Sequence, residues 1–417
     1  MLSYLQKDIN NRGGKSPSPQ PGRARKATLA LLIGSMFSLP AMAELNDTLH
    51  PFLSTMITHD DNLLRRDDSV PGQPDFSDTS KQVVGGLLLE RPIGRQLLTA
   101  SAKFSRVTFD RFQQFDYNGK DLDAALKWEL GNHVSGNVGA SYEETLTPFA
   151  ESLNDLRDLR IRRREFANVN WRFHPSWQVH GGVNDNKYTY DLVQEQVNNL
   201  TVKTDEFGVD YLAATGSRVG LLLRQLKGSY PEQLTASSGA FDNGYEQNEI
   251  NANIYWALSG TTQVIFVGGW VQRKHPHDAV RDDSGPNGRL IVNWAPLGKT
   301  HFTAAAWRQF GTAESNLVNS SLTKGESATA TWDATAKISV DALLKHESRR
   351  FDPLNGVTIL SDLNDSTNTA SLGVTYNPAA RIQLGASLFR ETRNGSPGAG
   401  TASYRAKGIS FNASGQF

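Results

Sequence analysis

The sequence contains no cysteine. Without thiols the chain has no disulfide, no thiolate metal site, no cysteine nucleophile and no lipidated cysteine anchor. After residue 43 it also lacks any apolar run near the roughly 18 residues that a membrane helix needs, and its mean hydropathy is −0.45. If the chain lies in a membrane it must therefore cross it with strands, whose backbone hydrogen bonds are all satisfied in a closed barrel.

The first 43 residues predict a cleavable export signal. Six basic residues precede an apolar stretch from Ala27 to Leu39, and Ala41-Met42-Ala43 supplies the small residues of a cleavage site. The remaining 374 residues carry 37 Lys and Arg against 42 Asp and Glu, a net charge of −5. This acidic balance disfavours a nucleic-acid partner. No linker and no change of composition divides residues 44–417, so we expect one large domain there.

Apolar and polar residues alternate strictly in many windows, which is the period of a strand whose two faces meet different surroundings. Clear examples are the windows 121–130, 249–258, 327–334 and 369–377. In the first of them Leu122, Leu126 and Trp128 share one parity, while Asp121 and Asp123 share the other. A helix would not place these apolar residues on one face. The alternation predicts an all-β chain.

Connections between these windows are alternately short and long. Short ones lie near Gly131, Pro175 and Gly260, and long polar stretches cover residues 60–81 and 230–244. Outer-membrane barrels have this pattern, with tight periplasmic turns and extended outer loops. From Leu49 to Phe417 the rule gives eighteen antiparallel strands, with sixteen as the fallback because residues 49–58 and 188–203 are weakly patterned. An even number places both ends of the barrel on the periplasmic side.

Aromatic residues favour the same architecture. Seven of them occupy the apolar parity a few residues before a short connection: Trp128, Trp171, Tyr211, Trp256, Trp294, Trp332 and Tyr376. Amphipathic rings prefer the headgroup region, so we expect a periplasmic girdle rather than the aromatic core of a soluble sandwich or propeller. The last window ends on Phe411 and Phe417, an ending that the outer-membrane assembly machinery recognises. The sequence thus predicts a transmembrane β-barrel in the bacterial outer membrane, surrounded by lipid and lipopolysaccharide.

Charged residues on the polar parity are expected to face the lumen, where a charge stays hydrated. The pore-lining candidates are Lys103, Asp121, Asp123, Lys127, Glu129, Arg162, Arg164, Arg172, Asp210, Arg224, Arg289, Asp341, Lys345 and Glu347. Two interpretations stay open. The charges form a selectivity ladder for an anionic or hydroxylated solute, since Arg binds carboxylates with both arms of its fork, or they are a solvated wall whose members only pair across strands. Basic groups are most prominent on the strand with Arg162, Arg164 and Arg172.

No motif indicates catalysis or a cofactor. The segment His59 to Asn62, followed by Asp67-Asp68, offers oxygen ligands but lacks the spacing and turn glycine of a calcium loop. His275-Pro276-His277 supplies two imidazoles without a third ligand. The nine His and many Asp would form chance constellations, and none has the local specificity of a Ser/His/acid set. We therefore expect no catalytic residues, no metal and no cofactor.

Several segments resemble EpsL-type proteins, outer-membrane barrels of exosortase/PEP-CTERM-associated exopolysaccharide operons. The similar segments run from His50 to Arg65, from Arg164 to Trp177 and from Gly288 to Thr300. At position 59 the chain has His where the family usually has Tyr. The resemblance implies a channel for exopolysaccharide export, with the polymer and other envelope export proteins as partners, and it supplies no catalytic residues.

Two other functions remain open from the residues alone. A general or small-solute porin is the principal alternative, and an outer-membrane glycan-modifying enzyme is the third. A folded loop that constricts the lumen would favour the porin. A Ser or His within hydrogen-bond reach of an acid in a cleft would favour the enzyme.

Overall fold

The computed structural model describes residues 48–67, 71–151, 155–236, 243–276, 279, 282–312, 318–353 and 363–417; the predicted export signal lies outside them. Eighteen strands account for most of this chain: β1 Leu49–Asp60, β2 Asp78–Ile93, β3 Gln96–Phe109, β4 Tyr117–Leu130, β5 Val134–Leu146, β6 Leu159–His174, β7 Trp177–Tyr190, β8 Leu200–Leu212, β9 Arg218–Ser229, β10 Tyr245–Ser259, β11 Thr262–Lys274, β12 Asp283–Leu297, β13 Thr300–Thr312, β14 Val318–Trp332, β15 Ile338–Pro353, β16 Asn364–Ala379, β17 Ile382–Asn394 and β18 Tyr404–Gln416. The predicted number of eighteen is confirmed, and the fallback of sixteen is wrong.

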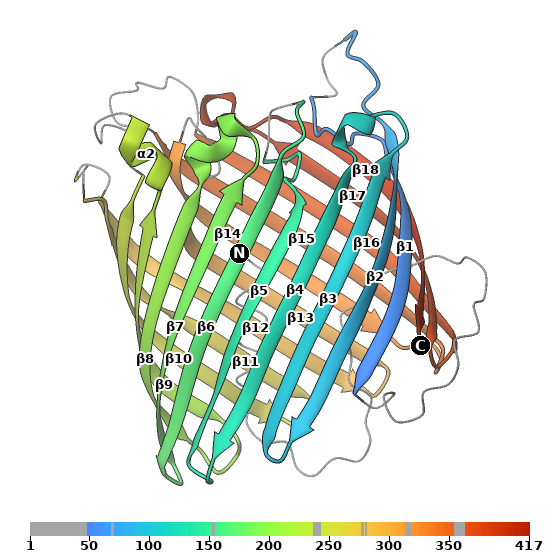
Figure 1. The fold of residues 1–417 in the computed structure, drawn as a ribbon. Coiled ribbons are helices and arrows are strands. Elements are labelled where there is room, and N and C mark those ends of the chain that lie inside the picture. Colours follow the sequence, from blue (N-terminus) through green and yellow to red (C-terminus); the bar gives the residue numbers. More distant parts are fainter. Residues whose placement is uncertain are drawn as a thin grey trace.

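Every strand pairs antiparallel with its sequence neighbours, and β1 pairs with β18 to close the sheet into a barrel (Figure 1). At this seam Phe52 lies opposite Gln416 and Asp60 lies opposite Gly408. The weakly patterned residues 49–58 form the regular strand β1, whose backbone groups pair on both sides. The all-β barrel predicted from alternation is therefore confirmed.

The short connections all lie at one end of the barrel, where β1 begins and β18 ends. The longer ones lie at the opposite end, and the short helices of the described chain belong to them: η1 Gln113–Phe115, η2 Val193–Asn198, α2 Pro231–Ala236 and η4 Pro397–Ala399. Among the described residues, no helix is long and apolar enough to cross a membrane. We call the two ends the turn end and the loop end.

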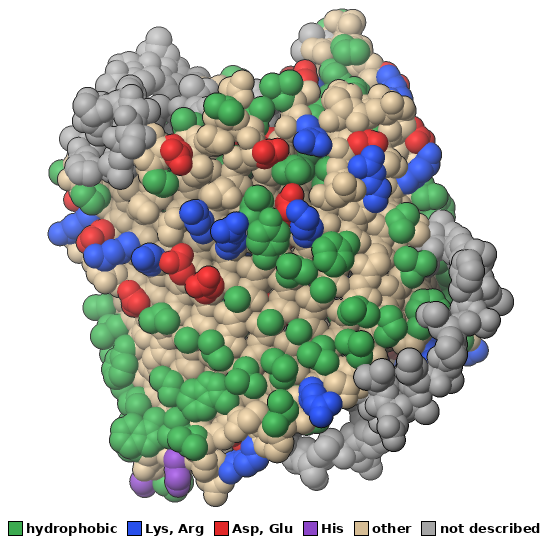
Figure 2. All heavy atoms as spheres, viewed as in Figure 1, with side chains coloured by type: hydrophobic (Ala, Val, Ile, Leu, Met, Phe, Trp, Pro, Cys, Tyr) green, Lys and Arg blue, Asp and Glu red, His purple; other side chains and the backbone are tan. Residues whose placement is uncertain are grey.

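The outer face is apolar near the turn end. Apolar side chains gather there, while charged ones occupy the loop end (Figure 2). The predicted girdle is part of the apolar zone: six of its seven rings are between 41 and 52% exposed on the outer face. The seventh, Trp128, lies over Gly136 of the neighbouring strand, where a side chain at residue 136 would collide with it. An apolar band bounded by aromatic rings is the surface that a bilayer covers.

Burial inside the barrel is divided among small clusters rather than one core. The largest lies at the loop end, where Leu64 and Phe115 from two outer loops pack on Val107 and Phe109 of β3. Phe149 from a third loop joins them, with its ring 4.8 Å from that of Phe115. These contacts bring the loops that follow β1, β3 and β5 together over one side of the barrel mouth.

Candidate functional site: the lumen cavity

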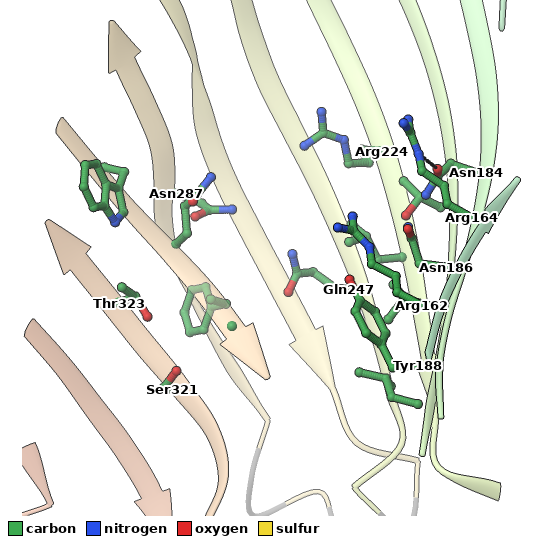
Figure 3. Close-up of a pocket in the computed structure, with 18 of the residues that line it drawn as sticks. Arg162, Arg164, Asn184, Asn186, Tyr188, Arg224, Gln247, Asn287, Ser321 and Thr323 are labelled. Atoms are coloured by element: carbon green, nitrogen blue, oxygen red, sulfur yellow. Dashed lines mark hydrogen bonds between the residues drawn. The ribbon is translucent and has the colours of Figure 1, made fainter. Parts of the chain in front are cut away.

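A cavity of about 590 Å³ lies within the barrel, lined by inward-facing residues of strands β5 to β15 and by parts of the loop end. Arg162 and Arg164 of β6 and Arg224 of β9 project from one wall, while Asn287 and Thr323 lie on the facing wall (Figure 3). Among the described residues, seven arginines and five glutamates line it, and no aspartate or lysine does. The lining of this cavity is therefore a mixture of apolar and charged side chains, with a net basic charge.

The alternation of β6 directs Arg162 and Arg164 inward. Val169, Trp171 and Phe173 have the opposite parity and are exposed on the outer face. Arg164 donates from Nε to Oδ1 of Asn184 on β7 over 2.9 Å, and its guanidinium lies 4.3 Å from the ring centroid of Phe166.

Arg162 and its neighbour in sequence face opposite sides of the wall. The Arg162 guanidinium lies 5.7 Å from the ring centroid of Tyr188 and 4.0 Å from a carboxylate oxygen of Glu143. Arg163, between the two inward arginines, is exposed on the outer face and stacks over Tyr142. The wall thus holds the two inward guanidiniums by a side-chain amide and by aromatic rings, which fix their direction.

Arg224 lies in a part of the cavity wall that also carries two glutamates. Its guanidinium lies 3.5 Å from Glu206 and 3.3 Å from Glu249, on the strands to either side. The Glu249 carboxylate is buried and also accepts hydrogen bonds from Gln247 and Asn251. Opposite charges on neighbouring strands attract strongly at this range because the surroundings are only partly hydrated. The arginine surplus is therefore concentrated toward β6 and the loop end.

The loop between β5 and β6 reaches from its own side of the barrel to the wall six strands away. Thr147 donates to Asp158 over 2.7 Å and closes the base of this loop. The carbonyl of Ala150 accepts a 2.7 Å hydrogen bond from Arg393 on β17, and Glu151 pairs with Arg160 at 2.9 Å. Ala150 and Glu151 line the cavity together with both arginines. Residues 147–151 of this loop therefore extend from β5 to β17 and form part of the cavity wall.

Arg393, which bonds the Ala150 carbonyl of that loop, belongs to a buried ion cluster. Asp365 on β16 is almost fully buried, with an oxygen 2.5 Å from Arg393 and 2.6 Å from Arg349. Two guanidiniums share one carboxylate, so the cluster keeps one positive charge beside the cavity. Arg349 and Arg393 both contribute to the cavity lining.

The structure brings only some of the predicted pore-lining residues to the cavity. Those that line it are Arg162, Arg164, Arg224 and Glu347. Others on the inner face are engaged within the wall: Lys345 with Glu347 at 3.1 Å, Asp341 with Thr331 at 2.8 Å, Arg289 over the Trp307 ring at 5.0 Å, and Asp210 with His180 at 3.0 Å.

The remaining candidates lie outside the cavity lining. Lys103 and Asp121 pair at 2.7 Å across β3 and β4, and Glu129 pairs with Arg95 beside a short turn. Asp123 and Lys127 share the inward parity of Asp121 on β4. Arg172 is exposed at the turn end of β6, far along the strand from Arg162. Some charges of the inner wall therefore pair across strands, whereas Arg162, Arg164 and Arg224 line the cavity.

Sequence reasoning missed the residues that shape the mouth of the cavity. Arg160, Arg349 and Arg393 have the inward parity of their strands. Alternation could have identified them: on β17, for example, Leu388 is exposed on the outer face and Arg393 has the opposite parity. Ala150 and Glu151 carry no such signal because loops have no period. Their position depends on contacts with a distant strand.

One acid-bound histidine occurs in the wall. His180 Nδ1 lies 3.0 Å from Asp210, which Gln178 and Arg218 also contact. His180 is only 7% exposed, and its Nε2 lies so close to Gly208 that a Cβ there would be 2.3 Å away. Neither His180 nor Asp210 is among the residues that line the cavity.

The segments considered for metal binding have protein partners instead. Asp60 pairs with Arg65 at 2.9 Å, and Asn62 bonds the backbone of Arg66. His275 is described and buried, while His277 and Asp68 lie outside the described residues. Among the residues that the structure describes, no group of three His, Asp or Glu side chains is placed to hold a metal ion.

Comparison with protein-family models and with curated proteins gives no match. Solved structures with a similar fold include Pseudomonas aeruginosa OccK5 (OpdH), at 12% identity and a TM-score of 0.46, which covers 89% of this chain and 99% of its own. The outer membrane protein OpdK from the same organism has 11% identity and a TM-score of 0.47 over the same shares. Acinetobacter baumannii OccAB3 has 9% identity and a TM-score of 0.47, over 88% of this chain and 99% of its own. The likeness concerns the fold alone.

The closed eighteen-stranded sheet, its apolar outer band and its polar lumen define the environment of the chain. A barrel with apolar residues outside and arginines inside is stable where lipid surrounds it and water fills it. The protein is a β-barrel of the bacterial outer membrane.

Proposed function

We propose that this barrel is a porin-type channel for small solutes, with a preference for anionic or polyhydroxylated ones. The loop segment of residues 147–151 carries the proposal, because it borders the cavity and is anchored to Arg160 and Arg393 on separate strands. A cavity of about 590 Å³ accommodates a small molecule. Guanidiniums in a hydrated lumen bind carboxylates weakly enough to release them, as transit requires.

Exopolysaccharide export, which the EpsL resemblance implies, takes second place. A polymer chain would have to pass the anchored loop, whereas a small solute needs only the space beside it. The resemblance rests on sequence segments, and the likeness to solved structures concerns the fold alone. A preference for hydroxylated solutes is shared by the two functions, so the experiment must separate them by the size of the transported molecule.

The test is ion selectivity of the purified barrel in planar bilayers, measured as the reversal potential in a salt gradient. We expect the wild type to prefer anions, because the cavity lining carries two more arginines than glutamates. The double variant Arg162→Gln/Arg164→Gln should lower the anion-to-cation permeability ratio about threefold, the effect of removing two charges at high dielectric. Arg163→Gln is the matched control, since it removes a cation from the same strand on the outer face.

Two results would contradict the proposal. One is a double variant with unchanged selectivity and full insertion, which would make these arginines wall structure. The other is a strain lacking the gene that loses surface polysaccharide while uptake of small anions is unchanged. That second result would favour the export function over the small-solute channel.

A further inference from the structure

The outer face of β12 to β17 carries a groove that the lumen function does not use. Its lining includes the outward-facing alanines of three strands, Ala304, Ala306, Ala328 and Ala370. Leu290 of β12 lies at one side, and Leu344 of β15 lies between Ala328 and Ala370. The volume of the groove is about 750 Å³. Alanine has no atoms beyond Cβ, so the wall is recessed at these positions, and the 63% exposed side chain of Leu344 projects between Ala328 and Ala370.

The groove is apolar toward the turn end and polar toward the loop end. Along β14, β15 and β16 the outward residue one step nearer the loops changes from Ala328, Leu344 and Ala370 to Glu326, His346 and Asn368. His346 Nδ1 lies 2.8 Å from Oδ1 of Asn368. On β17, Thr392 is level with Asn368, and Arg390 lies one step nearer the turn end, opposite Ala370. The groove thus changes from hydrocarbon to hydrogen-bonding groups in the same order as a lipid does from chain to headgroup.

Three exposed basic residues lie near this margin. Lys324, Arg350 and Arg390 are exposed on β14, β15 and β17, and within the described residues none of them forms an ion pair. Glu326 is the one carboxylate among the described residues of the groove lining. This face is therefore locally basic.

The opposite side of the barrel provides the contrast. On the face seen in Figure 2, positive and negative side chains lie close together above the apolar zone. Among the outward lysines there, Lys120 pairs with Glu144 at 2.7 Å and Lys227 pairs with Glu246 at 2.8 Å. Lys120 and Lys227 are therefore neutralised within the protein, whereas Lys324, Arg350 and Arg390 have no ion pair with a described residue.

We propose that the groove binds one lipopolysaccharide molecule of the outer leaflet. An acyl chain fills the alanine floor, and the phosphorylated sugar headgroup lies against His346, Lys324 and Arg390. The loop end faces the outer leaflet, where lipopolysaccharide supplies both the chains and the phosphates. Basic clusters at a membrane surface attract anionic headgroups by roughly 1 kcal/mol per cation. This inference does not depend on which solute the lumen carries.

The experiment measures lipid retention by native mass spectrometry of the purified full chain in detergent. The probes are bisphosphorylated lipid A, the same lipid without phosphates, and phosphatidylglycerol. We expect the wild type to retain one bisphosphorylated lipid A, and Lys324→Gln/Arg390→Gln to weaken its binding about thirtyfold. Ala328→Trp/Ala370→Trp should weaken it comparably by filling the floor. Lys120→Gln/Lys227→Gln, which removes two outward cations elsewhere, should bind as the wild type does.

The outcomes separate the possible occupants. Equal retention of dephosphorylated lipid A or of phosphatidylglycerol would overturn the assignment to lipopolysaccharide. If the tryptophan variant changes the oligomeric mass but not lipid retention, the groove is a contact between barrels and the proposal is wrong. If that variant does not fold, as judged by heat-modifiable mobility, the lysine and arginine variant alone decides.

Discussion

Single charged side chains in this barrel differ most in whether protein or water surrounds them. Asp365 is almost fully buried between two guanidiniums, whereas Asp121 pairs with Lys103 and stays 46% exposed. A buried charge without its partner has no water to stabilise it, while an exposed one does. Removing the Asp365 carboxylate should therefore destabilise the barrel much more than removing the Asp121 carboxylate.

At this scale we predict that Asp365→Asn lowers the free energy of unfolding by about 3–5 kcal/mol, because it leaves two guanidiniums near each other without a counter-charge. Asp121→Asn, the matched control, should cost less than about 1 kcal/mol. Guanidinium titration in micelles measures both. Equal losses in the two variants would show that the Asp365 cluster is not the buried anchor described above.

Among the elements, the loop segment of residues 147–151 is held by several separate contacts. An aromatic contact joins Phe149 to Phe115, an ion pair joins Glu151 to Arg160, and a backbone carbonyl binds Arg393. Outer loops are generally the least stable parts of a fold, and anchoring of this kind limits their excursions. The width of the channel should depend on these anchors.

We predict that Phe149→Ala/Glu151→Gln increases single-channel conductance, because the loop loses two of its anchors and leaves the lumen for part of the time. The barrel strands are untouched, so insertion should be normal. Val193→Ala, in the exposed short helix η2, is the control and should conduct as the wild type does. An unchanged conductance in the double variant would place the constriction elsewhere.

For the whole molecule, orientation follows from the even number of strands. Both β1 and β18 reach the turn end, so the turn end should face the periplasm and the loop end the cell exterior. The absence of cysteine makes this directly measurable, since any introduced thiol is the only one present.

We predict that Glu232→Cys, in the loop-end helix α2, reacts with a membrane-impermeant maleimide on intact cells. Thr215→Cys, in the connection of residues 213–217, should react only after the outer membrane is opened. Both side chains are exposed, so accessibility on the isolated barrel is similar. The reverse labelling pattern would invert the assigned orientation, together with the leaflet in which the outer groove lies.

The sequence alone determined the barrel, the number of its strands, the aromatic girdle and the inward direction of Arg162 and Arg164. These features depend on the period of two residues along a strand, which each window displays by itself. Only the tertiary structure decided that residues 147–151 border the cavity, because Ala150 meets Arg393 across 243 residues of sequence. It also decided which charges are buried in pairs, as with Asp365, and that four alanines on three strands line one groove. Alternation states which face a residue occupies, whereas a site depends on which distant strands bring their faces together.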